Sequence, residues 1–212
     1  MRTKTLLLTA ALSVAGVATS MAQTVYSVNA VGYVNLGLPT GFSIIANPLV
    51  AADNSVKALF AGSEAKMLDG TTIYKFTGTK YDLNTFEFGV WANPAMTLVP
   101  GEGAFIFVPT AGTFTNTFVG EVSAGSLTNS VPAGFSIKSS QVPQAGLLQT
   151  DLKYPADEGD TVYQFSNAAK KYVPASYEFG AWTAEPNVKV GEGFFIKPGA
   201  ARSWKRTFSI GG

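Results

Sequence analysis

The chain alternates between short β-type runs, where apolar residues take every second position, and turns rich in Gly, Pro, Asn and Asp. In the run TTIYKF at 71–76, for example, Tyr74 and Phe76 lie two residues apart and therefore on one face of a strand. Runs of this kind recur about every eight to twelve residues. The pattern predicts an all-β fold built of small sandwich or barrel-like domains, and residue frequencies do not choose between the two.

Helical patterning is confined to short stretches in the part of the chain after residue 22. One helical turn is predicted through Val56, Ala58 and Leu59, with Asp53 or Asn54 as its cap. The stretch 147–152 is a weaker candidate for an equivalent turn.

The same words occur twice along the chain. GFSI at 41–44 returns at 134–137, an offset of 134 − 41 = 93, and GEGAFI at 101–106 returns as GEGFFI at 191–196. The word EFGVW returns as EFGAW. These matches predict two tandem homologous domains, since insertions collect in loops while strand words persist. The signature residues that both copies share, interpreted as structural, are Glu87, Gly101, Glu102 and Gly103 with Glu178, Gly191, Glu192 and Gly193.

The N-terminus has the pattern of an export signal. Arg2 and Lys4 precede an apolar stretch, and Ser20-Met21-Ala22 forms a small-x-small cleavage site. The apolar stretch is short for a membrane span, although a retained anchor is the alternative. The predicted organisation is a signal peptide at 1–22, an N-terminal β segment at 23–38, a first domain at 39–122 and a second at 123–212. The destination is the periplasm, the cell surface or the extracellular space.

The segment TVYSVNAVGYVNLGL at 24–38 is β-rich and stands outside the repeat. Only the shorter stretch at 125–129 precedes the second copy in a comparable place. Two hypotheses follow: the segment completes its own first domain, or it adds as a strand to an open sheet edge of a neighbouring copy. The residues of this candidate assembly strand are Val25, Tyr26, Val28, Val31, Tyr33 and Val34.

Composition excludes several classes of function. The chain has no His and no Cys, which removes His-based catalytic triads, thiolate chemistry, disulfides and the usual zinc sites. Loss of the signal turns the formal +1 into 13 − 14 = −1, and a nearly neutral protein lacks the basic face that nucleic acid requires. The mature halves differ in charge, 4 − 7 = −3 for residues 23–130 and 9 − 7 = +2 for residues 131–212. No cofactor is predicted.

Paired carboxylates are the remaining catalytic candidates. Glu87 with Glu102, and Glu178 with Glu192, would serve glycoside hydrolysis if each pair were held a few ångströms apart. The favoured alternative is structural: a Glu between two glycines accepts hydrogen bonds from its own turn, and a Glu flanked by Phe points outward from a strand. No catalytic or metal-binding residue is therefore assigned.

Four aromatic residues are candidate platforms for sugar rings. Trp91 and Trp182 follow Phe-Gly pairs, which favours a core position over a stacking role. Tyr81 and Tyr172 stand beside turns and are the better candidates for exposure.

The words VYSVNAVGYVN, GFSI, GTTIYKF, EFGVW and GEGAFI, with their second copies, resemble a group of uncharacterised secreted tandem-repeat all-β proteins of the Verrucomicrobia type. The resemblance covers essentially the whole mature chain. It implies export and an all-β module, and it implies no enzymatic activity.

Together these observations lead us to expect a secreted, non-enzymatic structural or adhesive protein that assembles with itself into a filament or surface layer. A polysaccharide-binding module with exposed aromatic residues is the alternative, and a glycan-acting enzyme is the second alternative.

Overall fold

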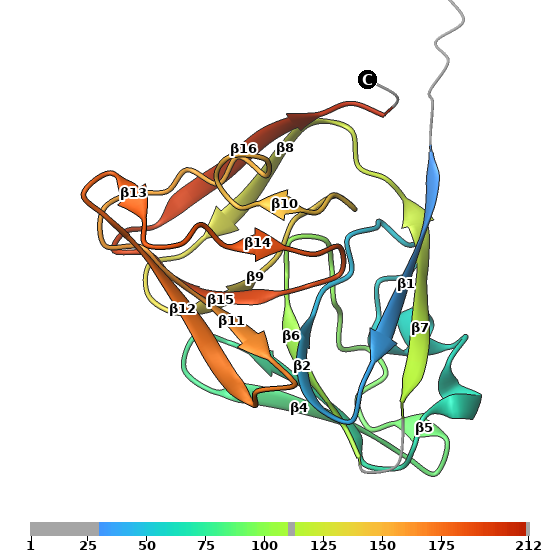
Figure 1. Ribbon diagram of the computed structural model, residues 1–212. Coiled ribbons are helices and arrows are strands. Elements are labelled where there is room, and N and C mark those ends of the chain that lie inside the picture. Colours follow the sequence, from blue (N-terminus) through green and yellow to red (C-terminus); the bar gives the residue numbers. More distant parts are fainter. Residues whose placement is uncertain (1–29, 110–112, 211–212) are drawn as a thin grey trace, which may run out of the picture.

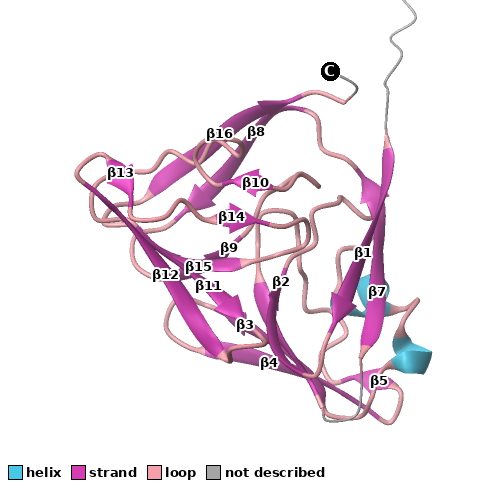
Figure 2. Cartoon of the chain, in the orientation of Figure 1, coloured by secondary structure: helices cyan, strands magenta, loops and turns pink. Residues whose placement is uncertain are grey.

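The computed structural model describes residues 30–109 and 113–210, and this part of the chain is mostly antiparallel β-structure (Figures 1 and 2). The all-β fold class predicted from the alternating runs is confirmed. The predicted export signal at 1–22 lies outside the described residues. In the described part of the chain, no helix has the length and apolar character needed to cross a membrane.

The first half is built on a five-stranded sheet in the order β2-β6-β3-β4-β5. Its strands are β2 (Gly41–Ile45), β6 (Ala104–Val108), β3 (Thr71–Phe76), β4 (Tyr81–Glu87) and β5 (Val90–Trp91). The interior strand β6 reads AFIFV and is apolar at every position. Because alternate side chains point to opposite faces, this sheet needs apolar cover on both sides.

The second half repeats this plan with a sheet in the order β9-β15-β11-β12-β13. Its strands are β9 (Ser136–Lys138), β15 (Phe194–Lys197), β11 (Thr161–Ser166), β12 (Lys171–Glu178) and β13 (Ala181–Trp182). The words that match in the sequence occupy matching strands in the two sheets. A common origin of the two halves remains a prediction from those words.

Each half also has a two-stranded ribbon. Strand β1 (Val31–Leu38) pairs with β7 (Phe114–Glu121), and β8 (Gly125–Val131) pairs with β16 (Arg202–Phe208), both antiparallel. The stretch at 125–129, identified from the sequence as the shorter counterpart of the N-terminal segment, is the beginning of β8, which takes the same place in the second half and has seven residues against eight in β1. Strand β8 shares few residue types with β1, which is why its full length to Val131 was not predicted.

A separate core fills the space between sheet and ribbon in each half. In the first, Leu38 of β1 and Phe118 of β7 pack in one cluster with Ile73 and Ile106 of the sheet. In the second, Val131 of β8 and Trp204 of β16 pack with Phe194 and Ile196. Each half is thus a small sandwich. Strand β1 belongs to the first core, so the boundary predicted after residue 38 separates residues that pack together.

Short elements close the open sides of the sandwiches. Helix α2 (Val56–Phe60) is capped by the Ser55 hydroxyl, which accepts a hydrogen bond from the Ala58 N–H at 3.3 Å. The predicted caps are wrong, because Asp53 instead accepts from the Ser55 N–H at 2.8 Å. The predicted turn at 147–152 is present as a turn without a regular helix: the Leu147 carbonyl accepts from the Asp151 N–H at 2.9 Å, and the Gln149 carbonyl accepts from the Lys153 N–H at 3.2 Å. It directly follows β10 (Gly146–Leu147), which pairs with β14 (Asn187–Val188). A 3-10 helix, η1, covers Glu64–Lys66.

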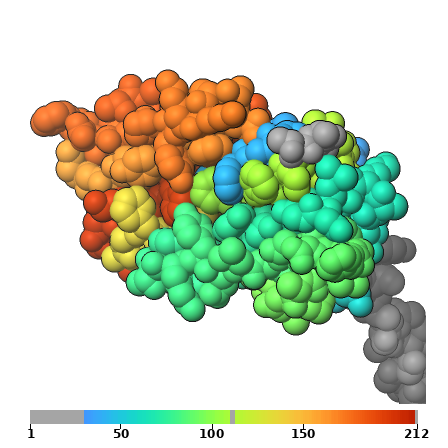
Figure 3. All heavy atoms as spheres, turned by 90° about the horizontal axis from the view of Figure 1, so that it is seen from below, coloured from blue at the N-terminus to red at the C-terminus, as the bar shows by residue number. Residues whose placement is uncertain are grey.

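The two halves are joined through their Gly-Glu-Gly turns. The Gly103 N–H donates to the Ile137 carbonyl at 3.3 Å, and the equivalent Gly193 N–H donates to the Ile44 carbonyl at 3.2 Å. Each turn therefore hydrogen-bonds to the first sheet strand of the other half. Figure 3 shows the two halves lying directly against each other.

Glycine is required at these turns for two different reasons. The first glycines, Gly101 and Gly191, have φ values of +94° and +78°, which disfavour other residues. The second ones lie at the junction, where a Cβ on Gly103 would be 2.6 Å from Cγ2 of Ile137, and one on Gly193 would be 2.8 Å from Cγ2 of Ile44. The second glycine of each Gly-Glu-Gly turn is therefore needed because the two backbones approach closely at the junction.

Substitution of Gly103 or Gly193 by Ala is expected to lower the free energy of unfolding by about 1–3 kcal/mol each, because the added methyl group overpacks the junction. Denaturant titration measures the change. Gly199→Ala is the matched control, since nothing lies within 4 Å of its Cβ position, and should change stability by less than about 0.5 kcal/mol. Wild-type stability in both junction variants would contradict the close approach.

Candidate functional site

The outer faces of the two five-stranded sheets meet in a cluster of aromatic residues. Ile44, Phe105, Ile137 and Phe195 form its buried floor, two residues from each half. Rings from both halves pack around this floor. We call the resulting depression the aromatic cleft, and its rings are Phe42, Tyr74, Phe76, Tyr81, Phe105, Phe135, Tyr163, Phe165, Tyr172 and Phe195.

Two pockets open in the aromatic cleft, and each is lined by Phe and Tyr residues. The first has a volume of about 300 Å³ and the second about 340 Å³. Their linings are equivalent, because every residue of one pocket has its repeat partner in the other. The first is lined by Phe76, Tyr81, Phe135, Tyr163, Tyr172 and Phe195, and the second by Phe165, Tyr172, Phe42, Tyr74, Tyr81 and Phe105.

Strand periodicity positions these rings. Tyr74 and Phe76 alternate along β3 with Ile73, a residue of the first core, and with Lys75, so the two rings point away from the first core and into the cleft. Tyr81 begins β4 directly across from Phe76, and their ring centroids are 5.1 Å apart. Phe165 and Tyr172 repeat this pair across β11 and β12 at 5.4 Å.

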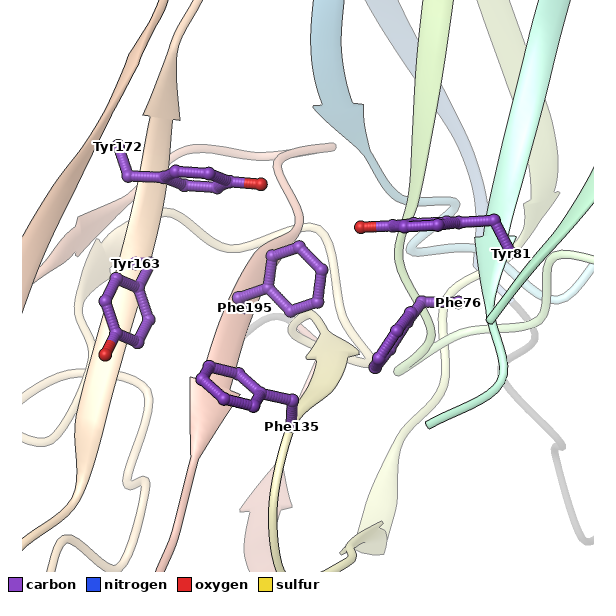
Figure 4. Close-up of a pocket in the computed structure, with 6 residues that line it drawn as sticks. All are labelled: Phe76, Tyr81, Phe135, Tyr163, Tyr172 and Phe195. Carbon is purple, nitrogen blue, oxygen red and sulfur yellow. The ribbon is translucent and has the colours of Figure 1, made fainter. Parts of the chain in front are cut away.

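Tyr81 and Tyr172 shape the opening shared by the two pockets. Their hydroxyl groups point toward each other across the cleft (Figure 4). The side chains remain 37 % and 42 % exposed, as the sequence predicted from their places beside turns. Partial burial raises the pKa of both phenols, and the charge of an ionised Tyr172 raises that of Tyr81 further. Both hydroxyls are therefore neutral donors near pH 7.

The two tryptophans that were candidate platforms lie elsewhere. Trp91 is 4 % exposed and packs its ring on Phe60 and Phe86 in the first core, so a stacking role for it is wrong. Trp182 is partly buried and packs on Tyr177 at the edge of the second core. A large ring next to a hairpin turn gains more from packing beneath that hairpin than from remaining in solvent.

The Gly-Glu-Gly carboxylates bind their own turns, as the structural interpretation predicted. Glu102 accepts from the Val99 N–H at 3.1 Å, and Glu192 from the Lys189 N–H at 2.9 Å. Each also accepts from the third strand of its sheet, Glu102 from Lys75 at 2.9 Å and Glu192 from Gln164 at 3.0 Å. These bonds keep the turns in shape at the junction.

Glu87 and Glu178 are exposed at the far ends of β4 and β12. Lys75, the partner of Glu102, pairs with Asp82 near the start of β4. The path from Asp82 to Glu87 covers five residues, or roughly 17 Å of strand. A hydrolytic pair needs about 5–9.5 Å between its carboxyl groups, so the paired glutamates of one half do not converge.

A smaller polar recess lies beside the junction, lined in part by Lys75, Glu102 and Lys138. Burial lowers the pKa of Lys138, and the charge of Glu102 opposes that shift. The negative charge of Glu102 offsets the positive charges of Lys75, from its own half, and Lys138, from the other half. Among the described residues, no group of three or more acidic side chains is placed to hold a metal ion.

The candidate assembly strand is paired within the chain where the structure describes it. Val31, Tyr33 and Val34 pair with Glu121, Val119 and Phe118 of β7. The hypothesis that the segment completes its own domain holds for these residues, because Val34 belongs to the first core. Val25, Tyr26 and Val28 lie outside the described residues.

Several residues of interest were missed by sequence reasoning. Phe42 and Phe135 sit at the cleft with 40 % and 43 % of their surface exposed, and Phe88 and Phe179 are almost fully exposed. The available signal for the last two was the dipeptide Phe-Gly in a position where Asn-Gly is the usual hairpin turn. Because this dipeptide occurs in both copies, it is a shared feature of the two hairpins and not a peculiarity of one loop.

The most deeply buried carboxylate, Asp160, serves the second core. Its Oδ2 accepts from the Tyr154 hydroxyl and from Nη1 of Arg202, both at 2.9 Å. Burial raises the pKa of Asp160, while the hydrogen bond from Tyr154 and the charge of Arg202 act to lower it. This group is an enclosed structural network and not part of the cleft.

No protein-family model, curated protein or solved structure matches the chain.

Tyr154→Phe is expected to lower the free energy of unfolding by about 1.5–3 kcal/mol at pH 7, because it removes a buried donor to an ionised carboxylate. The hydrogen bond from the Tyr154 hydroxyl favours the ionised form of Asp160, so its loss raises the pKa of Asp160 further in the variant. The deficit should therefore shrink as the pH falls through the folded-state pKa toward the ordinary value of 3.8. Denaturant titration between pH 4 and pH 7 measures it. Tyr177→Phe is the control, since its hydroxyl donates to a neutral, exposed carbonyl, and its effect should not vary with pH.

Proposed function

We propose that the protein is a secreted, non-enzymatic structural or adhesive protein that holds an apolar group of a protein partner in the aromatic cleft. The observation that carries this proposal is the pair of equivalent pockets lined by Phe and Tyr. Clustered, half-exposed rings cost solvation free energy in an isolated molecule, and such patches on folded proteins mark interaction sites.

The chemistry of the lining favours an apolar occupant. Rings supply the pocket walls, and the Tyr hydroxyls are their polar groups. Many ring pairs in the cleft meet edge to face, for example Phe105 with Phe165 at 82°. A further phenyl ring entering a pocket extends this arrangement, and such contacts contribute about 0.5–1.5 kcal/mol beyond burial.

An enzymatic role has less support in the structure. The glutamates that were catalytic candidates from the sequence lie in turns or at exposed hairpin ends. The cleft itself is lined by aromatic side chains. General acid and base chemistry needs a titratable group within hydrogen-bond reach of the substrate. Tyr81 and Tyr172, at the mouth of the cleft, have raised pKa values, which makes these two phenols poor bases near pH 7.

The small probe N-acetyl-phenylalaninamide should bind the cleft of the wild-type protein with a millimolar Kd, and Tyr81→Ser with Tyr172→Ser should weaken that binding about tenfold or more. Two-dimensional NMR reports the binding, because the shifts will concentrate on cleft residues. Tyr33→Ser is the matched control: Tyr33 is 71 % exposed on β1, outside the cleft. Absence of any cleft shift in the wild-type protein would refute the proposal.

Polysaccharide is the second candidate ligand, because Tyr81 and Tyr172 present partly exposed rings with hydroxyl groups at the mouth of the cleft. Calorimetric titration with neutral and acidic oligosaccharides tests this function. Tryptophan emission is a poor reporter here, since Trp91 and Trp204 are buried in the two cores. Binding that depends on Tyr81 and Tyr172, with no response to the phenylalanine probe, would favour the sugar.

A further inference from the structure

Each half carries an exposed phenylalanine at the end of a hairpin. Glu87 pairs with Val90, and Glu178 with Ala181, so each turn has two central residues. They are Phe88-Gly89, with φ of 52° and 78°, and Phe179-Gly180, with φ of 55° and 77°. Positive φ at both positions defines a type I′ turn, in which Asn or Gly is favoured first and a bulky residue is strained. We call these two turns the Phe tips.

The rings of the Phe tips gain nothing from the fold of a single chain. Phe88 is 90 % exposed and Phe179 is 97 % exposed. Both turns therefore combine an unburied aromatic ring with a backbone conformation that costs roughly 1–2 kcal/mol. The exposed ring and the strained backbone occur at matching positions in both halves. This repetition indicates that the tips have a role which the fold of a single chain does not explain.

Carboxylates hold the Phe tips in place. Asp69 accepts from the Phe88 N–H at 2.9 Å, and Glu158 accepts from the Phe179 N–H at 3.0 Å. Glu87 and Glu178 directly precede the two phenylalanines, so each tip carries two carboxylates. The segments 67–70 and 84–92, which form the first tip, contain no Lys or Arg.

The rim of the aromatic cleft carries the opposite charge. Lys80 and Lys171 directly precede Tyr81 and Tyr172, and Lys170 precedes Lys171; all three lysines are exposed. The amino group of Lys197 lies 5.4 Å from the centre of the Phe135 ring. Asp82 offsets part of this charge through an exposed ion pair with Lys80 at 3.4 Å, which is a weak interaction. Acidic tips and a basic rim are thus complementary.

We propose that a Phe tip of one copy inserts into an aromatic pocket of another copy, so that the chains associate head to tail. This inference rests on the proposed function of the cleft and names its occupant. The phenyl ring supplies the apolar group that the pockets fit, and the carboxylates around it meet the lysines of the rim. Acidic tips also repel anionic lipid headgroups, which argues against a membrane as the partner.

The fold keeps each tip away from its own half's side of the cleft. Strand β4 begins with the cleft residue Tyr81 and ends at Glu87 beside the tip, a span of roughly 20 Å. The same relation holds for β12. In Figure 1, β5 and β13, which follow the two tips, lie on opposite sides of the molecule. A contact between different surfaces of identical chains does not close on itself in general, and it produces open chains.

The test begins with sedimentation velocity of the purified protein at concentrations up to about 1 mM. We expect association that increases with concentration. The variant with Phe88→Asn and Phe179→Asn should associate about 30-fold more weakly or not at all, as for loss of a binding hot spot. Asn suits positive φ, so this variant should fold and unfold at the wild-type denaturant concentration or above it. The Tyr33→Ser control should associate as the wild-type protein does.

A mixing experiment tests the head-to-tail geometry. The tip variant keeps its pockets, and the variant with Tyr81→Ser and Tyr172→Ser keeps its tips. Each should be monomeric alone, and the mixture should form complexes of the two. No recovery on mixing would overturn the head-to-tail arrangement.

Two further outcomes separate this inference from the proposed function. If N-acetyl-phenylalaninamide binds the cleft but the wild-type protein stays monomeric, or the tip variant associates as well as wild type, then self-association through the tips is wrong and the cleft serves another protein. If the probe does not bind, the proposed function itself fails.

Discussion

The structure depends on the crossed hydrogen bonds between the two Gly-Glu-Gly turns and the first sheet strand of the opposite half. The carbonyl of Gly191 accepts from the Ala46 N–H at 2.9 Å, and that of Gly101 accepts from the Ser139 N–H at 3.2 Å. Buried backbone groups must be paired, so neither half satisfies its own turn alone. Glu102 and Glu192 then fix the turn shape from within. The junction is therefore a hydrogen-bonded crossing as well as an apolar contact.

This crossing also creates the aromatic cleft. The outer faces of the two sheets are apolar, because the central residues of β6 and β15 are apolar on both faces of each strand. The hydrogen-bonded junction brings these two outer faces together at an angle. Phe105 and Phe195 become buried where the faces touch, and the rings farther from the crossing stay half exposed. A simpler duplication, with two sandwiches on a flexible linker, would leave both faces in water and would have no shared pockets.

Much of the fold could be predicted from the sequence, because strand periodicity is a local property. The all-β class, the positions of most sheet strands and the turn role of Glu102 and Glu192 follow from alternation and from the repeated words. The stretch at 125–129 was placed from the sequence, but the full length of β8 and its pairing with β16 were not, because its sequence GSLTNSV carries little of the apolar pattern of β1. Phe42 and Phe135 were missed because an aromatic residue at the start of a strand looks the same whether it enters a core or lines a cleft. That difference depends on the packing of two sheets, which no local pattern encodes.

The crossed hydrogen bonds also affect how the molecule is made. During synthesis the N-terminal half emerges first, yet the acceptor for Ala46 and the donor for Ile44 belong to residues near the end of the chain. Until residue 193 is released, the first sheet keeps unpaired main-chain groups and an uncovered aromatic face, both of which invite chaperones and proteases. A chain truncated before residue 193 would therefore keep this surface exposed to proteases, even though its first core is complete.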